Sequence, residues 1–364
     1  MAEQAQRLER IESGLSLRVG ARKRLGRDLH AWDFDWQQPA TGAQTTRLVF
    51  LGWGEVIRSH WPKGLMSLVQ GFMPAYEVIL RRVRLGRVRQ LSPATFVTGA
   101  WPLLWVVSLC AVPLLTWFLM PWLLAMIATS AVVLGWRWLA RRTRMAWLLR
   151  IYIFVTRLAR GGVPETSALL HQLTNHFFDS IQGLEERKMN RAGEHPAGQE
   201  DQGILIVAHS VGAILAPLLV EQILTDPRME KIRQPLYLLT LGQCIPFVAL
   251  VPEAVSYRTS VAAVGQHPRL RWHDVTGRID SLCFHDTPPL ALTDHHHCPM
   301  PSLTHGTARF YPMYEPSHWR TFRRDKLRAH FLYLMTGDRP GNFNLYQLIA
   351  SPTPLLQSFQ EMSS

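Results

Sequence analysis

The hydrophobic positions of this chain are most concentrated in one block, from Leu91 to Trp136. No Asp, Glu, Lys, Arg or His occurs between Arg89 and Arg137. A single helix over this block would be about 70 Å long at about 1.5 Å per residue, more than twice the ~30 Å hydrocarbon thickness of a bilayer. The block therefore predicts two membrane-crossing helices of about 20 residues each. Pro121 is placed to begin the second, because the first turn of a helix tolerates proline.

Arginine residues flank this block on both sides: Arg81, Arg82, Arg84, Arg87, Arg89, Arg137, Arg141, Arg142 and Arg144. Arginine beside an apolar span favours retention in the cytoplasm and contact with anionic lipid headgroups. We therefore expect a multi-pass membrane protein with two helices and with cytoplasmic N- and C-terminal parts, in the inner (plasma) membrane if the source is bacterial. A buried soluble hairpin and a re-entrant hairpin in one leaflet are the alternatives.

Outside this block, short apolar runs alternate with stretches of helical periodicity. Strands are predicted at Arg47–Leu51, Ile204–Ala208, Leu236–Leu241, Arg269–His273 and Ala308–Tyr314, and helices at 56–90, 145–185 and Ala213–Leu224. Residues 1–45 are polar and predict one or two helices followed by a loop, and residues 184–202 predict an exposed loop. Apolar strands alternating with helices are typical of a parallel sheet covered on both faces.

Charge and cysteine content narrow the class of protein. A net charge of +12 is typical of proteins that bind nucleic acid. Much of the excess positive charge, however, flanks the apolar block, and no zinc-finger or RNA-binding motif accompanies it. No nucleic-acid partner is therefore expected. The four cysteines, Cys110, Cys244, Cys283 and Cys298, show no paired spacing. That distribution favours a reducing compartment over a disulfide framework.

The stretch from Gly203 to Ala216 carries the clearest chemical signal. A fully apolar strand leads into Ala208-His209-Ser210-Val211-Gly212, and an apolar helix follows at once. Small residues beside a serine suit a tight turn that raises the hydroxyl above the sheet, at the positive end of the next helix. The stretch resembles the G-x-S-x-G nucleophile elbow of α/β-hydrolases, with alanine in place of the first glycine. A serine that only caps the helix is the simpler alternative.

The resemblance covers residues 46–55 and about 203–335. It implies an α/β fold, a three-layer αβα sandwich with a mostly parallel sheet, plus the two-helix transmembrane hairpin. The domains expected are 1–90, the N-terminal part of the hydrolase-like domain with basic helices; 91–140, the hairpin; and 141–364, the main hydrolase-like domain.

The resemblance also implies a catalytic serine, acid and histidine in that order along the chain. Ser210 is the expected nucleophile. The expected acid is Asp280, in the loop after a strand, with Asp274 second and Asp286 third. The expected base is His330, which aromatic residues follow, with His318 as the runner-up.

An oxyanion hole would require two backbone N–H groups. The resemblance assigns one to Val211 and the other to Trp53 or Gly54, in the turn after an early strand, although this turn lacks the usual His-Gly pair. No metal or other cofactor is expected. The run from His295 to Cys298 has no second ligand pair at zinc-site spacing, and an exposed loop is the simpler interpretation.

Together these features predict a membrane-anchored serine hydrolase, esterase- or lipase-like, that forms an acyl-enzyme from a small-molecule or lipid ester. The lipid bilayer is the expected partner, and the oligomeric state is left open. The alternative is a catalytically inactive scaffold or binding protein that keeps the hydrolase fold in the membrane. The distance from Ser210 to a histidine discriminates between the two hypotheses. A transporter is disfavoured, because two helices without charged residues provide no pathway.

Overall fold

The computed structural model describes residues 1–82, 85–190 and 203–363. It divides into two compact units. The sheet unit consists of residues 1–56, 164–246 and 255–364, and the helical unit of residues 57–163 and 247–254. The chain is thus a mixed α/β protein in which most of the helical unit is one insertion between parts of the sheet unit.

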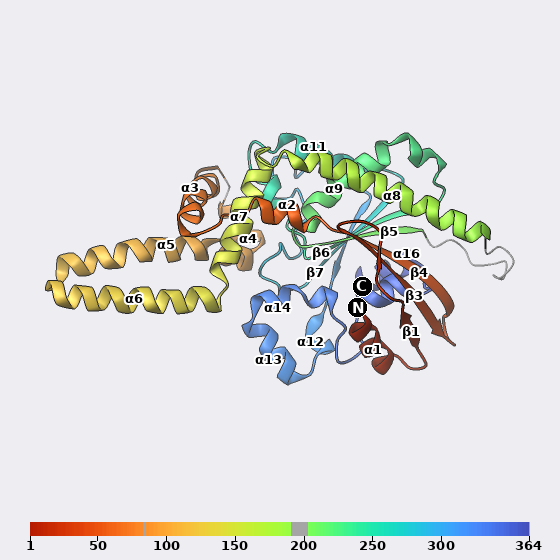
Figure 1. Ribbon diagram of the computed structural model, residues 1–364, viewed down its shortest axis with the longest axis horizontal. Coiled ribbons are helices and arrows are strands. Elements are labelled where there is room, and N and C mark those ends of the chain that lie inside the picture. The colour runs from red at the N-terminus through yellow and green to blue at the C-terminus, as the bar shows by residue number, and fades with distance from the viewer. Residues whose placement is uncertain (83–84, 191–202, 364) are drawn as a thin grey trace. The chain divides into compact units, whose positions relative to one another are not determined.

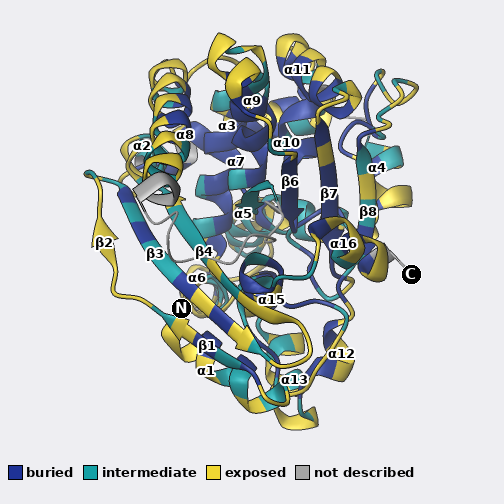
Figure 2. Ribbon diagram, turned by 90° about the vertical axis from the view of Figure 1, so that its right-hand side faces the viewer, coloured by how far each residue is buried: buried dark blue, intermediate teal, exposed yellow. Residues whose placement is uncertain are grey.

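A parallel four-stranded sheet lies at the centre of the sheet unit (Figure 1). Its strands follow one another in chain order: β5 (Ile204–His209), β6 (Leu236–Leu241), β7 (Leu270–Thr276) and β8 (Leu303–Thr307). Helix α9 (Gly212–Thr225) and the short η1 (Pro227–Lys231) connect β5 to β6, and α10 (Ile245–Ala249) and α11 (Val255–Gln266) connect β6 to β7. All six residues of β6 are buried (Figure 2), so both faces of this strand are covered.

The C-terminal part of the chain packs against one face of this sheet. Its elements are α12 (Phe310–Met313), α13 (Pro316–Arg324), α14 (Lys326–His330), η2 (Leu332–Leu334), α15 (Leu345–Ala350) and α16 (Leu355–Ser363). Tyr237, Leu239 and Leu241, which alternate along β6, share a buried cluster with apolar side chains of this segment, among them Tyr333 and Phe359. This cluster fixes the chain on either side of His330.

The strand predicted at Ala308–Tyr314 is wrong. β8 ends at Thr307, and Phe310–Met313 is helical. Phe310, Met313 and Tyr314 are buried in the same cluster, and their i, i+3, i+4 spacing is that of one helix face. Hydrophobic runs alone do not distinguish a short strand from a helical turn with this spacing.

The N-terminal region also differs from the prediction. After α1 (Ala2–Ile11), residues 16–51 form an antiparallel sheet of β1 (Ser16–Val19), β2 (Lys23–Arg24), β3 (Leu29–Gln38) and β4 (Gly42–Leu51). Phe34 and Trp36 of β3 pack against Leu8 of α1 and Tyr346 of α15. The run Arg47–Leu51 is therefore a strand, as predicted, but it pairs with β3 and not with the parallel sheet.

The predicted helical stretch 145–185 is two helices. α7 (Met145–Ala159) and α8 (Glu165–Asn190) are separated at Gly161, which has φ +72°. α8 continues into the predicted loop at 184–202, of which residues 191–202 lie outside the described residues.

The helical unit contains the two apolar helices expected from the sequence. These are α5 (Pro93–Leu119) and α6 (Trp122–Arg142), which lie side by side (Figure 1), with Pro121 directly before α6. Both are long and apolar enough to span a membrane, and 6% of the most apolar 18-residue stretch of each is buried. Because so little of α5 and α6 is buried, the alternative of a buried soluble hairpin is disfavoured.

The helices expected at 56–90 are α2 (Gly54–Ser59), α3 (Leu65–Arg82) and α4 (Leu85–Leu91).

The start of β5 provides a test of the parallel sheet. Gly203 has φ +105°, and a Cβ there would lie 2.7 Å from the carbonyl oxygen of Pro235. We expect Gly203→Ala to lower the free energy of unfolding by about 1–3 kcal/mol. Alanine rarely adopts this backbone conformation, and its Cβ would collide with the carbonyl oxygen of Pro235. Thermal unfolding in detergent measures this. Gly183→Ala in α8, where a Cβ meets nothing within 4 Å, is the matched control; equal midpoints for the two variants would contradict the packing described.

Candidate active site

Ser210 lies in a strained turn between β5 and α9. Its φ is +58°, a left-handed conformation that non-glycine residues adopt at a cost of about 1–3 kcal/mol. The backbone is held on both sides: Ser210 N–H donates to the carbonyl of Leu241 (3.0 Å), and Ala213 N–H donates to the carbonyl of Ser210 (3.0 Å). This is the strand–turn–helix geometry expected of a nucleophile elbow.

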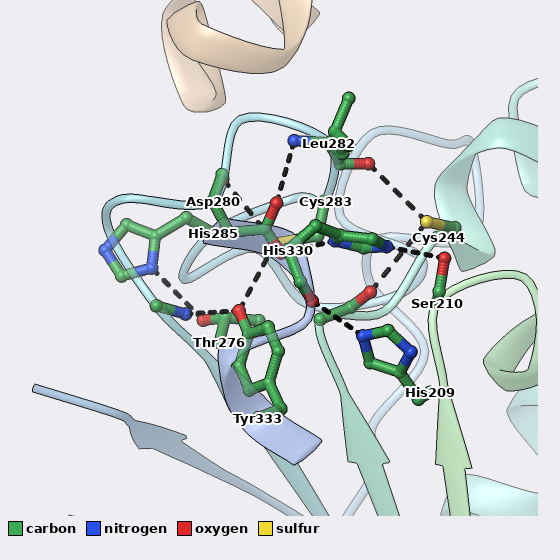
Figure 3. Close-up of polar contacts among 12 residues, drawn as sticks. His209, Ser210, Cys244, Thr276, Asp280, Leu282, Cys283, His285, His330 and Tyr333 are labelled. Atoms are coloured by element: carbon green, nitrogen blue, oxygen red, sulfur yellow. Dashed lines mark hydrogen bonds and ion pairs between the residues drawn. The ribbon is translucent and has the colours of Figure 1, made fainter. Parts of the chain in front are cut away.

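The side chain of Ser210 contacts His330, 120 residues later in the chain. Their Oγ and Nε2 atoms are 2.6 Å apart, and His330 Nδ1 lies 2.7 Å from Asp280 Oδ2 (Figure 3). Both His330 and Asp280 are 1% exposed. The structure thus brings together the three residues predicted as nucleophile, base and acid.

The protonation of Asp280 determines the direction of these hydrogen bonds. Burial alone would raise the pKa of this carboxyl group, but His330, the backbone N–H of Leu282 (2.9 Å) and Cys283 outweigh it and lower the pKa. The ionised carboxylate therefore accepts from His330 Nδ1–H. The other ring nitrogen, Nε2, is left with its lone pair facing the hydroxyl of Ser210, as a general base requires.

The loop that carries Asp280 is held closely by its neighbours. Gly242, in the turn after β6, has φ +52°, and a Cβ there would lie 2.9 Å from Asp280 Oδ2 and 2.8 Å from a ring carbon of Tyr333. The hydroxyl of Tyr333 accepts from Gly277 N–H at the start of the loop (2.8 Å). The carboxylate therefore has little freedom to leave His330.

The other acids and histidines considered from the sequence have different partners. Asp274 lies within β7, accepts from Thr240 Oγ1 (2.6 Å) and is 3.6 Å from His305 Nδ1. Asp286 is exposed. His318 lies on α13, and its Nδ1 is 2.7 Å from Asp338 Oδ2. His330 itself is the last residue of the short α14, and two further helices, α15 and α16, follow it in the chain.

The predicted oxyanion residues lie at two turns. Val211 follows Ser210 and directly precedes α9. Trp53 follows β4, and Gly54 begins α2. Trp53 Nε1 lies 4.0 Å from the position of a Cβ on Gly212, which places the indole ring of Trp53 beside the elbow. The role of the backbone N–H groups of Val211 and of Trp53 or Gly54 as oxyanion donors therefore stays a prediction.

Two side chains at the site were not assigned from the sequence. His209 Nε2 lies 2.8 Å from the carbonyl oxygen of His330, and Cys244 Sγ is 3.5 Å from the carbonyl of Leu282 (Figure 3). Burial and then the charge of Asp280 raise the pKa of the Cys244 thiol, although a hydrogen bond with Ser210 opposes them. Cys244 is therefore a neutral thiol and no rival nucleophile. The sequence offers no signal for either contact, because the partners are far apart in the chain.

Within the described residues, no group of three or more His, Cys, Asp or Glu side chains is arranged to hold a metal ion. His296 and His297 are exposed, in the loop predicted for that run.

Comparison of the chain with protein-family models, curated proteins and solved structures finds no match. A functional assignment must therefore come from the chemistry of the site.

The titration of His209 gives a test of the site's packing. Burial, and next the charge of His330, lower the pKa of His209 to about 3, from about 6.5 in an unfolded chain. The unfolded state therefore binds more protons below pH 6.5, so this contribution to stability is complete above pH 6.5 and is lost as the pH falls toward 3.

We expect thermal stability to decrease between pH 7 and pH 5 by about 1–2 kcal/mol more in the unmodified protein than in His209→Gln. Glutamine has no group that titrates in this range, and every other titratable group is common to the two proteins. Unfolding midpoints across this pH range measure the difference. Parallel curves for the two proteins would show that His209 is not buried in its neutral form.

Proposed function

We propose that this chain is a membrane-anchored serine hydrolase that cleaves an ester of a small-molecule or lipid substrate. The observation that carries the proposal is the unbroken series of hydrogen bonds from Ser210 through His330 to Asp280. Ser210 and Asp280 both follow the carboxyl ends of parallel strands, β5 and β7, the edge at which open α/β sheets bind ligands.

The proposed reaction begins when Ser210 Oγ attacks the acyl carbon and its proton passes to His330 Nε2. The negative charge on the tetrahedral oxygen is stabilised by backbone N–H groups, proposed to be those of Val211 and of Trp53 or Gly54. His330 then donates the proton to the leaving alcohol, and an acyl-enzyme remains. Water, deprotonated by His330, releases the acid and restores the serine.

Asp280 has two functions in this scheme. Its carboxylate accepts the Nδ1 proton of His330 and so holds the ring in the tautomer that can take a proton from Ser210. The same negative charge stabilises the imidazolium that forms after the transfer. Because both groups are buried, this interaction is little screened by solvent.

The sheet unit is proposed to be a three-layer αβα sandwich of the α/β-hydrolase type. Three features support this: the positive-φ serine between β5 and α9, the order of Ser210, Asp280 and His330 in the chain, and the complete burial of β6. The antiparallel sheet of β1 to β4 would be an addition to that fold.

The two apolar helices are proposed to cross the bilayer, with the residues on both flanks in the cytoplasm. The support is their length, their composition and the arginines beside them. An active site anchored in this way would meet acyl compounds that partition into the bilayer, so lipid esters and other hydrophobic esters are the proposed substrate class.

A catalytically inactive scaffold would need the packing of this fold but not its chemistry. It would have no need for a strained serine whose hydroxyl lies 2.6 Å from a buried histidine. The geometry therefore favours the enzyme.

The catalytic proposal is tested by ester hydrolysis. Purified protein in detergent is expected to hydrolyse p-nitrophenyl esters of short or long acyl chains. Ser210→Ala and His330→Ala are each expected to lower kcat/KM by about 10³-fold or more, because each removes a group that acts in the transition state. Ser317→Ala, at an exposed serine of α13, is the control and should retain full activity. Equal rates for Ser210→Ala and Ser317→Ala, or no hydrolysis across the ester panel, would exclude the proposed reaction.

The membrane topology is tested by cysteine labelling. In a background with Cys110→Ser and Cys298→Ser, Met120→Cys lies between α5 and α6, and Ser317→Cys lies on α13 of the sheet unit. A membrane-impermeant maleimide added to intact cells is expected to label position 120 and not position 317. Labelling of position 120 only after the cells are opened would favour a hairpin that does not cross the bilayer.

A further inference from the structure

His209 comes directly before the proposed nucleophile, and the reaction described above gives it no function. Its ring is placed against the chain around His330. The ring centroids of His209 and His330 are 4.8 Å apart, and those of His209 and Phe331 are 5.2 Å apart. His209 Nε2 lies 2.8 Å from the backbone carbonyl oxygen of His330 (Figure 3).

The carbonyl partner determines the tautomer of His209. A carbonyl oxygen can only accept, so Nε2 must carry the proton and donate it. The lowered pKa of His209, caused first by burial and then by the charge of His330, keeps the ring neutral at physiological pH. His209 is therefore a fixed donor that does not take part in proton transfer.

The position of the carbonyl explains why a donor is needed there. His330 is the last residue of α14, a five-residue helix, and the last carbonyl groups of a helix have no donor within the helix. A buried carbonyl without a partner costs about 1–3 kcal/mol. The hydrogen bond from His209 satisfies this group and ties the end of α14 to the end of β5.

We propose that His209 is a positioning residue for the base, and this inference rests on the proposed function. Two adjacent residues of the elbow then hold His330 by different atoms. Ser210 bonds the ring at Nε2, and His209 bonds the backbone at the carbonyl oxygen. Asp280 holds the remaining ring nitrogen, so that His330 is held at three points, two on its ring and one on its backbone.

Loss of the hydrogen bond from His209 would free the backbone of His330, while the side chains of Ser210, His330 and Asp280 would all still be present. The distance between Ser210 Oγ and His330 Nε2 would then vary, and a misplacement of about 1 Å can reduce a rate by about 10²-fold. Because His209 contacts no proposed substrate atom, kcat should fall while KM changes little.

Three substitutions separate the hydrogen bond from the packing of the ring. In His209→Gln the side-chain amide nitrogen can occupy the position of Nε2 and donate to the carbonyl. In His209→Asn the shorter amide aligns with Nδ1 and does not reach it. In His209→Phe the ring packing stays and the donor is lost. We expect kcat within about 3-fold of the unmodified protein for glutamine, and about 10- to 100-fold lower for asparagine and phenylalanine.

Ester hydrolysis and hydrogen exchange of the full-length protein in detergent provide the two readouts. Faster exchange in peptides covering residues 326–334 is expected for His209→Asn and His209→Phe, but not for His209→Gln. This readout does not depend on catalysis, so it tests the tether even if the hydrolase proposal fails in the Ser210→Ala experiment. A phenylalanine variant that misfolds leaves the comparison of glutamine with asparagine intact.

Two results would overturn the inference. If His209→Phe keeps both the activity and the exchange rates of the unmodified protein, the hydrogen bond does not position His330. If His209→Gln loses as much activity as His209→Asn and its exchange rises equally, the donor at Nε2 is not the property that matters.

Discussion

The hydrogen bond between Ser210 Oγ and His330 Nε2 joins two residues 120 positions apart, and the proposed chemistry depends on it. One end is fixed by the strained turn after β5, and the other by the packing of the C-terminal segment against the parallel sheet. Neither element could shift by an ångström without separating the two atoms. The buried cluster around Tyr333 is therefore part of the site as much as of the core.

The buried carboxylate of Asp280 imposes the second constraint. A charge removed from water is costly unless hydrogen bonds and an opposite charge offset the loss of hydration. Here the backbone N–H of Leu282 and the ring of His330 do so, and Gly242 allows the chain to approach closely. The proposed reaction needs this ionised group, because it selects the tautomer of the histidine and stabilises the imidazolium.

The features that the sequence predicted correctly have local signals. Pro121 and the uncharged block mark α5 and α6, and the small residues beside Ser210 mark the turn after β5. The antiparallel sheet was missed although Trp32-Asp33-Phe34-Asp35-Trp36 in β3 alternates aromatic and acidic residues, a period-two pattern typical of strands. The contacts of His209 and Cys244 had no local signal, because tertiary packing alone places their partners beside them.

The activation of Ser210 is tested most directly by covalent modification with an alkyl fluorophosphonate, with the modified residue mapped by peptide mass spectrometry on the unmodified protein. Such reagents phosphonylate a serine only when a base activates it. We expect one adduct, on the peptide that contains Ser210, formed at a rate that falls when His330 is replaced by alanine. An adduct on a different residue, or no adduct on Ser210, would show that Ser210 is not an activated nucleophile.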